Sequence, residues 1–264
     1  FGRRVATNVH TPGFTSNYNS LQSRLDRRLS ASWLATVSYT WSKSIAYAAN
    51  SDSSLFFHTP EARPRNRSLT SFDRPHNLQA SSVVELPFGR GKRWAQSGVP
   101  ALLAGGWQIN GVFSAYTGTP FNVTTAATAL NAPGNSQVAD QVKSSVEKFG
   151  NIGRGSSFFD PFAFRPVNEA RFGNAGLAIL RGPGVVNLDL GVFRNVFSRE
   201  RWNLQLRAEA FNATNTPQFN NPGATVSSMI LNPDGTIRSL GGYTEVTSAA
   251  RAERQFRFAL RFAF

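Results

Sequence analysis

The side chains best suited to catalysis or metal binding are few in this chain and lie far apart. Its three histidines are His10, His58 and His76, and it has no cysteine. Their separations match none of the short spacings typical of metal sites, and the missing cysteines exclude disulfides, zinc–thiolate sites and a cysteine nucleophile. The sequence contains no glycine-rich phosphate loop and no serine-nucleophile elbow. We therefore expect neither a metal nor a cofactor.

Two carboxylates, Asp189 and Glu209, could form a general acid–base pair. Both fall in segments that alternate polar and apolar residues, as do Arg207 and Arg257. Oppositely charged side chains on adjacent strands commonly pair, so we interpret these four residues as balanced charges on one face of a sheet. The chain is accordingly predicted not to be an enzyme.

A second group of residues suited to binding combines phenylalanine with arginine in segments without periodicity. Its members are Phe56, Phe57, Arg63, Arg65, Arg67, Phe162, Phe164 and Arg165. Such residues either pack loops against one another or face a ligand. In the second case the ligand is an anionic or partly aromatic solute.

The charge balance is strongly basic, with 28 Lys and Arg against 15 Asp and Glu and a net charge of +13. A strongly basic chain suggests nucleic acid or an anionic membrane surface as a binding partner. The arginines are spread mostly singly from Arg3 to Arg261, and the densest groups lie in Gly/Pro/Ser-rich segments. We expect solvated loop charge, with some attraction to the phosphates of membrane glycolipid, and no nucleic-acid partner.

The elements that must position these side chains are strands, because the dominant period is two. Within 32–42, Val37, Tyr39 and Trp41 alternate with Thr36, Ser38 and Thr40, as expected for a strand with one apolar and one polar face. The same test predicts seven long strands, at 17–29, 32–42, 76–88, 107–117, 186–197, 202–212 and 254–264. Helical periodicity is nearly absent, and the one weak candidate is 135–149.

Short and long connections alternate between these strands, which is typical of a transmembrane β-barrel of the bacterial outer membrane, with long extracellular loops. Charges are costly on the lipid face, so the polar face is predicted to line the lumen. Its charged members are Arg24, Asp26, Glu85, Asp189, Arg207, Glu209, Arg257 and Arg261. A periplasmic aromatic girdle is predicted at Trp33, Trp107 and Trp202.

Consecutive sequence blocks resemble Oar-like TonB-dependent receptors. They include Tyr39-Thr40-Trp41-Ser42-Lys43-Ser44, Phe72-Asp73-Arg74-Pro75-His76, Thr117-Gly118-Thr119-Pro120-Phe121, Arg181-Gly182-Pro183-Gly184 and Pro217-Gln218-Phe219. The resemblance implies that residues 1–264 are the C-terminal part of a large plugged barrel of about 22 strands, without the plug and the N-terminal strands. It also implies a location in the outer membrane of a Gram-negative bacterium and TonB-coupled uptake of a bulky, unidentified ligand.

The sequence ends on alternate apolar residues, Phe256, Phe258, Leu260, Phe262 and Phe264. This ending resembles the signal that the barrel-assembly machinery recognises, and it also suits a lipid-facing strand. An odd number of strands favours a fragment, an open curved sheet with two unpaired edges. The alternatives are a small passive porin-like or structural barrel and, less favoured, a soluble basic β-protein that binds nucleic acid.

Overall fold

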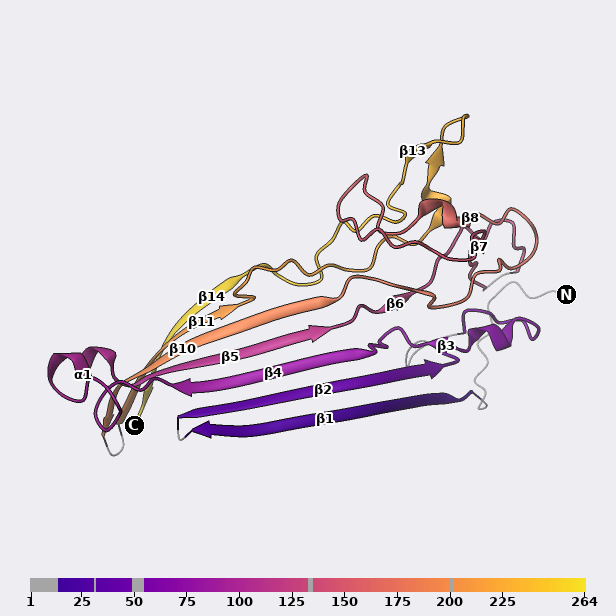
Figure 1. The fold of residues 1–264 in the computed structure, drawn as a ribbon. Helices are drawn as coiled ribbons and strands as arrows, with labels where there is room; N and C mark the ends of the chain where they lie inside the picture. Colours follow the sequence, from indigo (N-terminus) through magenta and orange to yellow (C-terminus); the bar gives the residue numbers. More distant parts are fainter. Residues whose placement is uncertain (1–13, 31, 49–54, 133–134, 200–201) are drawn as a thin grey trace.

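The computed structural model describes residues 14–30, 32–48, 55–132, 135–199 and 202–264. Their main feature is one antiparallel sheet in which strands follow one another in chain order (Figure 1). Its long strands are β1 (Ser16–Ser30), β2 (Trp33–Ala46), β4 (His76–Glu85), β5 (Trp107–Tyr116), β10 (Val185–Arg199), β11 (Trp202–Phe211) and β14 (Gln255–Ala263). The predicted strands and the all-β, antiparallel fold class are confirmed.

The sheet is open within the described residues. β1 pairs with β2 and β14 pairs with β11, and neither has a second neighbour there. The short strand β3 (Ser68–Leu69) adds two pairs to the end of β2. The two sheet edges therefore present free backbone N–H and C=O groups.

The register keeps the two faces of the sheet chemically distinct. Val37 of β2 lies opposite Leu25 of β1 and Ala80 of β4, whereas Thr36 lies opposite Asp26 and Ser81. Directly paired residues project to the same face, so apolar residues meet apolar neighbours from strand to strand. We call the side of Val37 the apolar face and the side of Thr36 the polar face.

The remaining elements are short and gather at the two ends of the long strands (Figure 1). At one end lie β6 (Pro120–Phe121) with β9 (Leu180–Arg181), β7 (Asp140–Gln141) with β8 (Phe164–Arg165), β12 (Ile230–Leu231) with β13 (Ile237–Ser239), and the 3₁₀ helices η1 (Arg63–Asn66), η2 (Pro161–Ala163) and η3 (Val226–Ser228). At the other end lies the seven-residue helix α1 (Gly98–Ala104). The weak helical candidate at 135–149 forms no helix: strand β7 occupies part of that segment and the rest is irregular. Nowhere in the described ranges is there a helix long and apolar enough to cross a membrane.

The buried core lies in the connections rather than in the sheet. We call the described parts of 47–75, 117–184 and 212–254 the loop cap. Its core is built from Phe57, Ala62, Val123, Val138, Ala139, Phe158, Phe159, Ala163, Phe164, Ala175, Val226, Tyr243 and Val246. These residues come from all three long connections, so the connections fold onto one another as a single packed unit.

Candidate functional site

An ionic junction fastens the loop cap to the sheet. Asp73 is buried, and its Oδ1 accepts a hydrogen bond of 2.6 Å from the backbone N–H of Ser44 in β2. Its Oδ2 pairs with the guanidinium of Arg181. Arg181 also donates to the carbonyls of Asp73 (3.0 Å) and Gly118 (3.2 Å). Segments around residues 44, 73, 118 and 181 therefore meet around one buried ion pair, between Asp73 and Arg181. We call Ser44, Asp73, Gly118 and Arg181 the rim junction.

Glycine is required beside this junction because backbones touch there. A Cβ on Gly118 would lie 2.1 Å from the carbonyl oxygen of Gly182.

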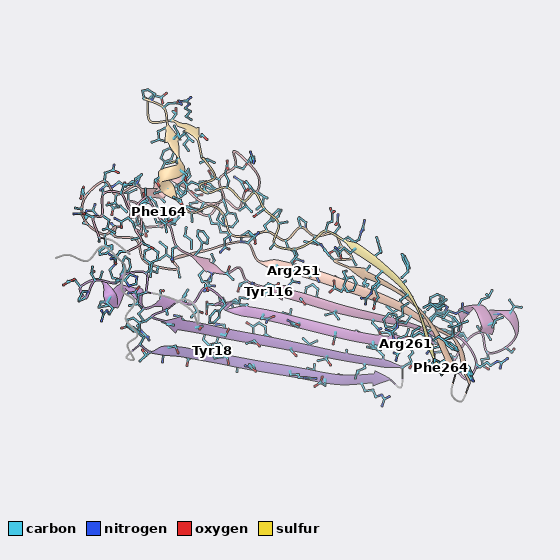
Figure 2. All side chains as sticks on the ribbon, turned by 180° about the vertical axis from the view of Figure 1, so that it is seen from behind. Tyr18, Tyr116, Phe164, Arg251, Arg261 and Phe264 are labelled. Carbon is cyan, nitrogen blue, oxygen red and sulfur yellow. The ribbon has the colours of Figure 1, made fainter. Side chains whose placement is uncertain are left out.

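Arg74, the neighbour of Asp73, donates to the carbonyl of Thr117 (3.0 Å) and lies 4.2 Å from the ring centroid of Tyr116. Tyr116 accepts a hydrogen bond of 3.0 Å from Arg251, at the base of the cap (Figure 2).

A second ionic cluster stabilises the cap itself. Asp140 is 3% exposed and receives hydrogen bonds from Arg171 at 2.9 and 2.7 Å, with Arg165 at 3.5 Å. The hydrogen bonds from Arg171 are the main reason that the pKa of Asp140 falls to about 2, against the opposing effect of burial. Burial raises the pKa of Tyr243, and the nearby charge of Asp160 adds to that rise. These groups keep one protonation state near neutral pH, which fits a structural role.

Asn66 organises the first long loop. Its Oδ1 accepts from the backbone N–H groups of Phe56 (2.8 Å) and Phe57 (2.9 Å). Its Nδ2 donates to the carbonyls of Phe57 and Arg63, each at 2.9 Å. All the hydrogen-bonding capacity of a 1%-exposed side chain is thus used within the loop. Sequence reasoning missed this role, since a lone asparagine in a loop carries no distinguishing signal.

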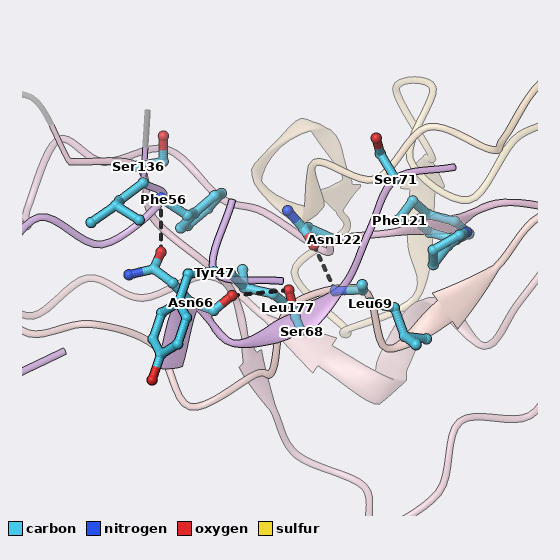
Figure 3. A pocket seen from close by; sticks show the side chains of 13 residues that line it. Tyr47, Phe56, Asn66, Ser68, Leu69, Ser71, Phe121, Asn122, Ser136 and Leu177 are labelled. Carbon is cyan, nitrogen blue, oxygen red and sulfur yellow. Dashed lines mark hydrogen bonds between the residues drawn. The ribbon is translucent and has the colours of Figure 1, made fainter. Parts of the chain in front are cut away.

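Three cavities adjoin one another where the cap meets β3 and the cap-side end of β2. Leu69 and Ala178 line all three. The first, of about 250 Å³, is lined by aromatic and polar residues such as Tyr47, Phe121 and Asn122 (Figure 3). The second, of about 290 Å³, is mainly apolar. The third, of about 460 Å³, is lined by Lys43, Arg65 and Arg67 with no acidic residue. The geometry therefore offers a partly apolar, cationic site for a small anionic group.

The structure divides the phenylalanine and arginine residues that were expected either to pack the loops together or to face a ligand. Phe57 and Phe164 are 0% and 2% exposed and belong to the core of the cap, so of the two alternatives these two residues take loop packing. Phe164 and Phe159 meet edge to face with ring centroids 6.2 Å apart. Phe56 packs partly against the core and lines the first cavity, whereas Phe162 is 43% exposed.

The four arginines in that group are also unequal. Arg65 donates to the carbonyls of Gly173 (2.6 Å) and Ala175 (3.1 Å) and lies 4.5 Å from the ring centroid of Phe57. Burial lowers its pKa. Arg63 and Arg67 are exposed, and Arg67 donates to Asn17 at 2.9 Å. Arg165 is exposed beside Asp140. Arg63, Arg67 and Arg165 thus have guanidinium surface available to solvent.

The eight charges predicted to line a lumen all lie on the polar face, by register. They are Arg24, Asp26, Glu85, Asp189, Arg207, Glu209, Arg257 and Arg261. Their exposure to a lumen stays a prediction, but the face that they share is now defined.

The expected pairing of these charges holds in part. Glu209 lies opposite Arg257 and binds it at 2.5 Å. Asp189 instead accepts from the Asn187 side chain (2.9 Å) and from the backbone N–H of Asn212 (2.8 Å). Arg207 donates to Gln205 at 2.7 Å and lies 5.1 Å from the ring centroid of Phe193. In the register, Phe193 lies opposite Arg207 and Gly191 lies opposite Glu209. Asp189 therefore has no arginine opposite it and forms its hydrogen bonds with asparagines.

The aromatic residues predicted for a girdle lie at the end of the sheet opposite the cap. Trp33, Trp107 and Trp202 each begin a strand at that end, on the apolar face. Trp202 packs against Phe262 and Phe264, with ring centroids 5.2 and 6.3 Å apart. Phe264 lies at this end in Figure 2, far from Phe164 in the cap.

The terminal alternation Phe256, Phe258, Leu260, Phe262 and Phe264 follows the apolar face of the edge strand β14 and is highly exposed. Its role as an assembly signal stays a prediction. His76 contacts the hydroxyl of Tyr39 at 2.8 Å, and His10 lies outside the described residues. In the part of the chain that the structure describes, no three His, Asp or Glu side chains are grouped so as to hold a metal ion.

Comparison with known proteins gives one match. The family model for an outer membrane β-barrel domain matches residues 4–257. No curated protein and no solved structure matches the chain. The match covers nearly all of the open antiparallel sheet with its exposed apolar face and its long connections. The chain therefore belongs to the family of outer membrane β-barrel domains.

Proposed function

We propose that this chain is the C-terminal part of the barrel of an Oar-like TonB-dependent receptor, which takes up a bulky ligand with energy relayed by TonB. The observation that carries the proposal is the rim junction. Three of the sequence blocks that resemble this receptor class supply Asp73, Gly118 and Arg181, and a fourth supplies Ser44. The sequence blocks that carry the resemblance thus come together at one place in the structure, although they are separate in the sequence.

The polar face supports a wide interior. It carries charged residues along β1, β4, β10, β11 and β14, several of which are exposed. A barrel of about eight strands has an interior that its own side chains fill, whereas a barrel of about 22 strands holds a plug. Unpaired strand edges cannot face lipid, so β1 and β14 need further strands as neighbours. On this proposal the rest of the receptor supplies these strands and the plug.

The cap supplies the ligand-facing surface in this proposal. Arg63, Arg67, Phe162 and Arg165 are exposed, and the cationic cavity opens beside Arg67. Guanidinium groups beside aromatic rings suit an anionic or partly aromatic ligand. The outer-membrane glycolipid, the barrel-assembly machinery and TonB complete the proposed set of partners.

Two measurements on the full-length protein test this function. The purified protein should bind the isolated periplasmic domain of TonB in a pull-down, and a planar bilayer containing it should show no stable open conductance, because the plug closes the barrel. Absence of TonB binding together with a discrete, stable conductance would contradict the proposal. That result would favour the alternative, a passive porin-like barrel.

A further inference from the structure

Helix α1 presents an apolar face that no part of the described protein covers. Val99, Leu102 and Leu103 are spaced three and four residues apart and so share one side of the helix. They are 66%, 67% and 62% exposed, and no residue of α1 is buried. A short helix with this pattern usually packs its apolar side on a core. Here that side needs an apolar environment from outside the chain.

The helix is fastened to side chains of the apolar face of the sheet. Trp107 and Arg194 lie opposite each other on that face, and the guanidinium lies 5.2 Å from the indole centroid. Trp107 donates from Nε1 to the carbonyl of Leu103 at 3.1 Å. Arg194 donates to the carbonyls of Leu102 and Gly105. The carbonyl end of α1 is therefore held on the side of the sheet that faces lipid in this family.

Close backbone contacts fix the direction of the connection between β4 and β5, which contains α1. Gly89 has φ +108°, and a Cβ there would lie 2.8 Å from the Cα of Gly105. Gly106 has φ +77°, and its Cβ would lie 2.6 Å from the carbonyl oxygen of Asn195. Only glycine tolerates both the positive φ and the approach. The helix thus has a defined position beyond the strand ends, opposite the cap (Figure 1).

The turn that precedes α1 adds cations and an indole. Arg90 and Arg93 are exposed, and Arg93 lies 5.1 Å from the ring centroid of Trp94, which is itself 49% exposed. Exposed apolar side chains beside arginine and tryptophan are the composition of segments that lie in a membrane interface.

We propose that α1 and this turn form an interfacial anchor, which inserts Val99, Leu102 and Leu103 into the phospholipid leaflet at the end of the barrel opposite the cap. Arg90 and Arg93 contact the lipid phosphates of that leaflet. The occupant is lipid because the exposed helix face continues the apolar face of the sheet through Trp107 and Arg194. The anchor applies to any barrel that contains this chain, so it does not depend on TonB coupling.

Site-directed labelling tests the anchor. The chain has no cysteine, so Leu102→Cys in the full-length protein, freed of any other cysteine, can carry an environment-sensitive nitrobenzoxadiazole dye. The matched control is Val142→Cys, which is 49% exposed in the cap. Both variants are reconstituted in vesicles of phosphatidylethanolamine and phosphatidylglycerol containing a lipid with a nitroxide at the upper acyl chain. The Leu102 label should emit at shorter wavelength and be quenched at least twofold more than the Val142 label.

Equal quenching of the two labels would overturn the proposal. A dye at Leu102 that becomes shielded only after periplasmic extract is added would also overturn it, in favour of a protein partner. Val99→Cys repeats the test on the same helix face if the Leu102 variant does not fold, and it should give the same blue shift and quenching.

Discussion

The wall of long strands and the loop cap place the same residue types in opposite environments. Phe258 of β14 is 77% exposed and Leu25 of β1 is 62% exposed, whereas Phe57, Val123 and Phe159 in the cap are buried. The wall keeps its apolar side chains outward and leaves lipid to cover them. The cap buries its own apolar side chains, as a water-soluble domain does. One chain thus folds against two solvents, and the rim junction lies at the border between them.

The largest difference should come from removing one phenylalanine ring in each region. Phe159 has three aromatic neighbours, Phe121, Phe164 and Tyr243, with centroids 5.5 to 6.2 Å away. Phe159→Ala should reduce the stability of the cap by about 3–5 kcal/mol. Limited proteolysis of the reconstituted full-length protein measures this as much faster cleavage in the cap. Phe258→Ala is the matched control and should leave cleavage of the cap unchanged, whereas equal effects would remove the distinction between the two regions.

A charge placed on the two faces of β2 should distinguish lipid from water. Val37→Arg puts a guanidinium on the apolar face, at a cost of about 2–4 kcal/mol near the bilayer centre. Thr36→Arg is the neighbouring control on the polar face, where Asp26 lies opposite. We expect Val37→Arg to lose most of its insertion in a vesicle folding assay, and Thr36→Arg to insert like the parent. Equal insertion of the two variants would contradict the assignment of the faces.

The rim junction should be the next most sensitive feature. Asp73→Asn keeps an acceptor for the N–H of Ser44 but leaves Arg181 without its carboxylate. Because the Arg181 side chain is 28% exposed, we expect a loss of about 2 kcal/mol, below the range for fully buried pairs. Hydrogen exchange should speed up at the upper end of β2 and around Gly118. Protection unchanged at both places would show that the junction does not couple the cap to the wall.

Acid should loosen the cap without altering the wall. The folded-state pKa of Asp140, about 2, lies below its ordinary value of 3.8. The stabilisation is therefore complete above pH 3.8 and is lost as the pH falls towards 2, at a cost of about 1–2 kcal/mol. Thermal unfolding followed by near-ultraviolet circular dichroism should show this dependence, and Asp140→Asn should weaken it. The same pH dependence in the variant would assign the effect to other groups.

The long strands of the wall could be predicted from the sequence because each alternates apolar residues on one face with polar residues on the other. The strands predicted at 17–29 and 107–117 are observed at Ser16–Ser30 and Trp107–Tyr116. The strand predicted at 76–88 ends earlier, at Glu85, because Pro87 lacks the N–H that would continue the ladder. Helix α1 was missed, since seven residues are too few to show a helical period.

The cap could not be predicted in the same way. Asp73 and Arg181 are 108 residues apart, and neither the pairing nor the role of Asn66 follows from local periodicity. Burial of Phe57 and Phe164 depends on how three long connections fold together. The sequence blocks at the junction were recognisable, but their meeting point is a tertiary property.

The alternation of lipid and water along β2 tests the central claim most directly. Single cysteines at positions 35, 36, 37 and 38 of the full-length protein, made free of other cysteines, can be reacted with a charged, membrane-impermeant maleimide from both sides of the bilayer. We predict fast labelling at Thr36→Cys and Ser38→Cys, which lie on the polar face, and at least tenfold slower labelling at Ala35→Cys and Val37→Cys. Equal labelling rates at all four positions would contradict a wall with one lipid-facing and one water-facing side.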